Sequence, residues 1–148
     1  GVGAWCMECR GVQVGALVVV NPLGNIHDPE TGEFLAGARD THGRPHGPEE
    51  IHAALAGEDL PPSNTVLVIV ATNVPLDKVQ TSRLARMAAA GIPRAIRPAH
   101  LVYDGDIVFA LASKRPLPRD AGPWTENLLG ALGAEAVGKA ITTAVTAG

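Results

Sequence analysis

A polar pair, Asn64-Thr65, stands directly before the most apolar stretch of the sequence, VLVIVAT at 66–72. A run of apolar, mostly β-branched residues predicts a strand buried on both faces, in the middle of a sheet. A threonine at the head of such a strand has its hydroxyl fixed in place, as a nucleophile requires. The alternative is an ordinary loop, because Asn and Thr are both common in turns.

Two further polar groups stand at the ends of apolar stretches. Asp104 and Asp106 flank a glycine directly before IVFALAS at 107–113, and Asn21 closes the stretch that begins at Gly11. Asp-Gly is a common turn pair, and an Asn side chain can cap a turn. If the strand ends meet at one edge of a sheet, however, a hydroxyl, an amide and two carboxylates come together there.

That set of groups suits acyl transfer with an amino-terminal threonine. A threonine hydroxyl is a weak nucleophile at neutral pH, but the α-amino group of the same residue, with a reference pKa of about 7.7–8.0, can act as its base when the residue is N-terminal. A carboxylate within hydrogen-bonding reach holds the ammonium form in place. A side-chain amide, here that of Asn21, can donate to the oxyanion.

The sequence WCMEC at 5–9 offers a different chemistry, since Cys6 and Cys9 could form a redox pair or half of a zinc site. A redox pair normally follows a strand and opens a helix, whereas this one lies at the start of the sequence. A zinc site needs two more ligands. The histidines are scattered through the chain, at His27, His42, His46, His52 and His100. We therefore expect no metal and no cofactor.

Gly and Pro residues mark the expected boundaries between helices, strands and loops. Strands are predicted at 11–21, 66–72 and 107–113, and a loop at 22–47. Helices are predicted at 48–57, from Asn73 through about Ala90 with a continuation to Pro98, and from Trp124 to about Ala147. Strands alternating with helices indicate an α/β or α+β layered domain, 1–148, with the strands in the middle and the helices outside.

The composition of the sequence argues against several classes of protein. The formal charge of −3 and the absence of a basic cluster argue against nucleic acid as a partner. Apolar runs of strand length fall short of the roughly 18 residues that predict a membrane helix. Two cysteines are too few for a disulfide framework, so a cytoplasmic setting is expected.

Two segments together resemble a known family. NTVLVIVATNVPLDKVQTSRLARMAAAGIPRAIRPAHLVYDGDIVFALAS at 64–113 is similar to the small-subunit start of a family of N-terminal-nucleophile hydrolases, and VGALVVVNPLGNIHDPETGEFLAGAR at 14–39 resembles the segment before its cleavage site. The family contains L-aminopeptidase/D-esterases, β-peptidyl aminopeptidases and nylon-oligomer (6-aminohexanoate oligomer) hydrolases.

The resemblance implies a self-processing precursor. It implies cleavage between Asn64 and Thr65, with Thr65 as the nucleophile of the small subunit 65–148 and with 1–64 as the end of the large subunit. Asn21 matches the asparagine that holds the oxyanion. Asp104 and Asp106 match the pair that positions the nucleophile and its amine. The implied fold is a layered sandwich of β-sheet between helices, shared with ornithine acetyltransferases.

The implied activity is amide-bond hydrolysis in small peptides or oligoamides by a homo-oligomer. Two alternatives stay open beside it. One is an acyltransferase of the ornithine acetyltransferase type that uses the same threonine. The other is an unprocessed, inactive homologue with a binding or structural role.

Overall fold

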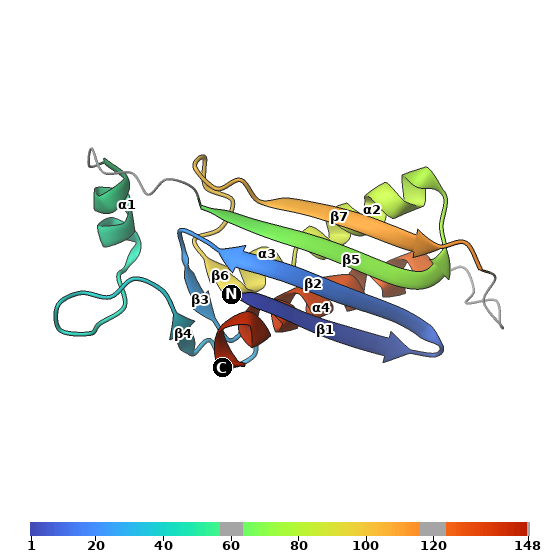
Figure 1. Ribbon diagram of the computed structural model, residues 1–148, viewed down its shortest axis with the longest axis horizontal. Coiled ribbons are helices and arrows are strands. Elements are labelled where there is room, and N and C mark those ends of the chain that lie inside the picture. The colour runs from blue at the N-terminus through green and yellow to red at the C-terminus, as the bar shows by residue number, and fades with distance from the viewer. Residues whose placement is uncertain (57–63, 116–123, 148) are drawn as a thin grey trace.

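The computed structural model describes residues 1–56, 64–115 and 124–147 and has one central four-stranded sheet (Figure 1). The strand order is β1-β2-β5-β7, in which β5 runs antiparallel to β2 and parallel to β7. A second, three-stranded sheet has the order β4-β3-β6. The strands are β1 Val2–Cys9, β2 Val12–Asn21, β3 Asn25–His27, β4 Phe34–Ala36, β5 Thr65–Pro75, β6 Ile96–Arg97 and β7 Ile107–Ser113. The helices are α1 Pro48–Ala56, α2 Lys78–Ala89, α3 Ile92–Ala95 and α4 Thr125–Thr146. The expected α/β class is confirmed.

Helices α2 and α4 cover one face of the four-stranded sheet, as Figure 1 shows. Alternate side chains of β2 and β5, from Val12 to Val20 and from Val66 to Val70, point toward them and form the core. Gly3 lets α4 approach β1 closely, because a Cβ there would lie 2.1 Å from the carbonyl oxygen of Ala140.

Helix α4 is long and apolar enough, by length and composition alone, to cross a membrane. From the sequence, no apolar run approaching membrane-spanning length was expected. In the structure it is a core helix, with Ala136, Val137, Ala140 and Ile141 fully buried against the sheet and α2.

Strand β5 lies between β2 and β7, so its predicted central place is confirmed. The prediction that both of its faces are buried is wrong. Val66, Val68 and Val70 are fully buried, whereas Leu67 and Ile69 are 45% and 41% exposed. The helices cover one face only, and apolar composition does not reveal on how many sides a strand is covered.

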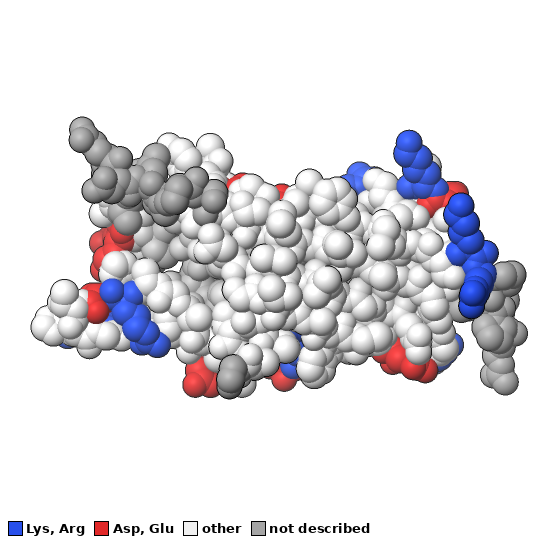
Figure 2. Space-filling view, viewed as in Figure 1, with Lys and Arg blue, Asp and Glu red and all other residues white. Residues whose placement is uncertain are grey.

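The uncovered face of the sheet is apolar across its strands. Figure 2 shows its centre free of Lys, Arg, Asp and Glu, with charged side chains gathered at the rim. The pairing of the strands places these exposed side chains side by side: Val19, Leu17, Leu67, Ile69, Ile107, Phe109 and Leu111. We call these seven residues the open face.

Other predicted boundaries also shift. Strand β5 continues to Pro75, and α2 begins only after Asp77, whose carboxylate accepts from the backbone N–H of Gln80 in a capping box. Residues 96–97 form β6 instead of continuing a helix, and the predicted loop 22–47 contains β3 and β4. Strand β1 was not predicted. Helices α1 and α4 lie where expected, although residue 57 is outside the described part.

Candidate active site

Thr65 and Asn21 lie directly opposite each other across the β2–β5 pair. Side chains of directly paired residues project to the same face of an antiparallel sheet, with Cβ atoms about 5 Å apart. Because Thr65 shares the alternation of Leu67 and Ile69, both polar side chains lie on the open-face side. The hydroxyl and the amide are thus neighbours, although they are 44 residues apart in the sequence.

The peptide bond between Asn64 and Thr65 is held by the turn that carries the aspartates. The carbonyl oxygen of Asn64 accepts the backbone N–H of Gly105 at 3.0 Å and the hydroxyl of Thr65 at 2.6 Å. Asn64 also forms a parallel bridge with Asp104. A carbonyl with this N–H donor is polarised, and the hydroxyl lies beside it.

Gly105 fits against the hydroxyl because it has no side chain. A Cβ at this position would lie 3.0 Å from Oγ1 of Thr65. Glycine therefore lets the turn approach both the hydroxyl and the carbonyl of the same peptide bond.

Asp106 fixes the residue that follows Thr65. Its Oδ1 accepts the backbone N–H of Val66 at 3.0 Å, and its Oδ2 lies 3.0 Å from Nδ1 of His100. The Asp106 side chain is only 6% exposed, so its carboxylate is a buried group with a partner on each oxygen.

Asp104 connects the turn to the chain beyond Asn21. Its Oδ1 accepts the backbone N–H of Leu23 at 3.4 Å, and its Oδ2 accepts that of Leu101 at 3.2 Å. The turn from 101 to 106 thus contacts both β2 and β5 at the end where Asn21 and Thr65 lie. The structure brings all of the predicted site residues to this one end of the sheet.

Two residues of this cluster were not predicted from the sequence, His100 and Gly105. Sequence reasoning treated His100 as one of five scattered histidines. Its position six residues before Asp106 was the only available signal, and neither a regular helix nor a regular strand brings residues six apart into contact. Gly105 was read only as part of a turn.

Cys6 and Cys9 lie within β1, where residues three apart point to opposite faces of the sheet. Both are free thiols, and neither opens a helix. Over the described ranges, no three His, Cys, Asp or Glu side chains gather closely enough to hold a metal ion. This strand geometry does not favour a redox or zinc role for the pair.

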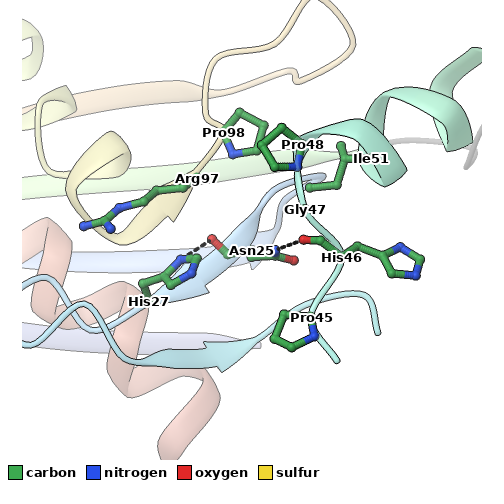
Figure 3. A pocket seen from close by; sticks show the side chains of 9 residues that line it. All are labelled: Asn25, His27, Pro45, His46, Gly47, Pro48, Ile51, Arg97 and Pro98. Carbon is green, nitrogen blue, oxygen red and sulfur yellow. Dashed lines mark hydrogen bonds between the residues drawn. The ribbon is translucent and has the colours of Figure 1, made fainter. Parts of the chain in front are cut away.

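A cavity of about 530 Å³ lies between β3, the start of α1 and the segment at 97–98. In Figure 3 the Asn25 side chain lies between His27 and His46, and its Nδ2 donates to the carbonyl oxygen of His46 at 2.7 Å. Its Oδ1 is buried and has no partner in the part of the chain that the structure describes. The cavity is lined by Asn25, His27, Pro45, His46, Gly47, Pro48, Ile51, Arg97 and Pro98.

Residues on both sides of the cavity are close in sequence to residues of the polar cluster. Asn25 is four residues from Asn21, which is at most about 14 Å of extended chain. Pro98 is two residues from His100, and a Cβ on Gly24 would lie 2.0 Å from the carbonyl oxygen of Pro98. The cavity and the polar cluster are therefore linked by short segments of chain.

The arrangement is that of a mixed sheet with helices on one face and a hydroxyl, an amide and carboxylates at the strand ends. The sequence model of Peptidase family S58 matches residues 2–148. The chain belongs to this family.

Relatives in the family carry names of amide-cleaving enzymes. An uncharacterized aminopeptidase of Mycobacterium tuberculosis (strain ATCC 25618 / H37Rv) is 39% identical over 151 residues, which cover 91% of this chain and 44% of that protein. A 6-aminohexanoate-oligomer endohydrolase of Kocuria sp. (strain KY2) is 32% identical over 157 residues, covering 97% of this chain and 44% of that protein. The chain thus spans less than half the length of these relatives.

Solved structures share the fold. The L-aminopeptidase D-Ala-esterase/amidase of Ochrobactrum anthropi, described as a new variant of the Ntn hydrolase fold, has a TM-score of 0.58 and 24% identity. The similarity covers 97% of this chain and 39% of that one. A β-aminopeptidase of Burkholderia sp. has a TM-score of 0.55, again at 24% identity, covering 97% of this chain and 41% of that one.

Proposed function

We propose that the chain is a self-processing amide hydrolase with Thr65 as its nucleophile. The main support for this proposal is the geometry of the Asn64–Thr65 peptide bond. Its carbonyl oxygen accepts a hydrogen bond from the N–H of Gly105, and the Thr65 hydroxyl lies 2.6 Å from the same oxygen. Membership of Peptidase family S58 and the names of the relatives support amide-bond cleavage.

In this proposal, self-cleavage consists of transfer of the acyl group to the hydroxyl, followed by hydrolysis. Oγ1 of Thr65 attacks the carbonyl carbon of Asn64, and negative charge gathers on the oxygen that faces the N–H of Gly105. The C–N bond then breaks as the hydroxyl proton moves to the departing nitrogen, which leaves an ester. Water hydrolyses that ester, restores the hydroxyl, and leaves Thr65 with a free α-amino group.

The freed amine supplies the base that the hydroxyl otherwise lacks. Asp106 already accepts from the next backbone N–H, so it holds the start of the strand while the amine takes the proton from Oγ1. The amide of Asn21, opposite Thr65, donates to the oxyanion of the acyl intermediate. Asp104 keeps the chain beyond Asn21 in register with the turn.

We assign small peptides or oligoamides as substrates, and we place their non-reacting part in the cavity lined by Asn25 and Arg97. Arg97 at the cavity wall forms no ion pair within the described ranges, so it is free to bind a substrate carbonyl or carboxylate. We also propose that the protein forms a homo-oligomer and is cytoplasmic. Its two free thiols are consistent with a reducing compartment.

Mass spectrometry of the purified chain tests this function. The expected result is two fragments that meet between Asn64 and Thr65, and one intact chain for Thr65→Ala. Thr65→Ser should still cleave, and Thr31→Ala in an exposed loop is the matched control. Cleavage at the same bond in Thr65→Ala would refute the assignment.

A second assay separates hydrolysis from acyl transfer. An amino-acid anilide is incubated with the processed protein in the presence and absence of a free amine acceptor. We expect the free amino acid as the product in both cases. An acylated acceptor as the main product would favour the acyltransferase.

A further inference from the structure

The carboxylate of Asp106 depends on a histidine that has no assigned role. Asp106 is buried, and a buried carboxylate is stable only when its oxygens have partners. The backbone N–H of Val66 supplies one partner, and the ring of His100 supplies the other at 3.0 Å. These two contacts hold the plane of the carboxylate.

Two features of His100 indicate that its contact with Asp106 is specific. Nδ1 of His100 lies 3.0 Å from Oδ2 of Asp106, and a ring that carries a hydrogen on Nδ1 attracts the carboxylate at this distance. Its backbone has φ +56°, in the left-handed region that residues other than glycine rarely adopt. Such conformations persist where the surrounding structure enforces them, and they are concentrated at functional sites.

We propose that His100 is a positioning residue for Thr65, acting through Asp106. The contact to Oδ2 turns Oδ1 toward Val66, and the bond to Val66 fixes the peptide unit that follows the nucleophile. Without His100, the carboxylate rotates toward water and the start of β5 loosens. The effect on catalysis rests on the proposed function, whereas the effect on Val66 does not.

The first experiment measures the positioning directly. Amide hydrogen exchange at Val66 is followed by NMR in the full chain, with Thr65→Ala as background so that every sample stays uncut. His100→Ala should raise the exchange rate of this amide about tenfold, which corresponds to the loss of one hydrogen bond. His100→Asn should restore protection, because the Asn amide can donate from the place of Nδ1 and Asn tolerates positive φ. His42→Ala, in an exposed loop, is the matched control.

The second experiment measures the consequence in chains that keep Thr65. His100→Ala should slow self-cleavage about 10- to 100-fold, the cost expected when a reacting group is misplaced by up to 1 Å. On an amino-acid anilide it should lower kcat by a similar factor with KM within about twofold, because the histidine does not touch substrate. His100→Asn should recover both rates to within about threefold of the parent.

Each outcome decides one question. Unchanged Val66 protection in His100→Ala overturns the proposal, and so does an equal loss in His100→Ala and His100→Asn, since the shape of the ring and not its contact with Oδ2 of Asp106 would then matter. Loss of protection without loss of cleavage rate overturns the catalytic part. If the parent chain fails to cleave at all, the proposed function is refuted while Val66 exchange still decides the role of His100.

Discussion

Gly105 gives the sharpest quantitative prediction. A Cβ at this position would lie 3.0 Å from Oγ1 of Thr65, whereas ordinary contacts begin near 3.4 Å. In Gly105→Ala the hydroxyl must therefore move by about 0.4 Å. On the scale by which a 1 Å misplacement costs about 100-fold, this shift corresponds to a rate loss of about sixfold. The N–H donor to Asn64 is kept, so a much larger loss is not expected.

The assay is the rate of conversion of the freshly translated chain into two fragments, followed by denaturing electrophoresis. Gly15→Ala is the matched control, because its added methyl comes no closer than 3.9 Å to its nearest neighbour, the carbonyl oxygen of Trp5. Thermal unfolding of both variants in the Thr65→Ala background shows whether the fold is kept. Cleavage of Gly105→Ala at the parent rate would refute the close approach of the turn to the hydroxyl.

Three further predictions follow from the sheet and its helices. Val68→Ala should lower the free energy of unfolding by about 2 to 3 kcal/mol and Leu67→Ala by about 1 kcal/mol, because only Val68 is fully buried. Urea denaturation measures both losses, and equal losses would show that the open face is covered in solution. Asn21→Ala should lower kcat on an amino-acid anilide about 100-fold with an intact fold, as for loss of an oxyanion donor, and steady-state kinetics with a circular dichroism spectrum would check this. The hydrogen bond from Gln80, with help from Arg83, lowers the pKa of Glu126 below its ordinary value of 4.5. A carboxylate whose pKa is lower in the folded chain stabilises the fold at pH values above its pKa in the unfolded chain. The stability difference between the parent and Glu126→Gln should therefore shrink as pH falls through the folded-state pKa. Urea midpoints of the two proteins that stay equally far apart from pH 7 to pH 3 would contradict this.

The sequence alone was enough to predict the α/β class, the central place of β5 and the residues at the end of the sheet. Apolar, β-branched residues favour strands, so the runs around Val68 and Val18 indicate strands without a structure. The approach of Asp106 to Thr65 was foreseen because polar groups at the ends of neighbouring strands meet at one edge. Local chemistry also located the start of α1 at Pro48 and the extent of α4.

What the sequence did not decide was which neighbours those elements have. A Leu at 67 and a Val at 68 look equally apolar, and only the position of α2 and α4 on one side makes the second buried and the first exposed. The capping box at Asp77 moved the start of α2 beyond the predicted residue 73, because β5 continued to pair with β7 up to Pro75.

The contacts within the site depend on the tertiary structure most of all. The backbone at His100 takes a positive φ and its ring lies 3.0 Å from Asp106, and the sequence around His100 predicts neither feature. Gly105 could be read as a turn residue, but its approach to the Thr65 hydroxyl requires the β5–β7 pairing that brings the turn beside the strand. The sequence thus determined which polar groups stand at the strand ends, and the packing of those ends determined which of them touch.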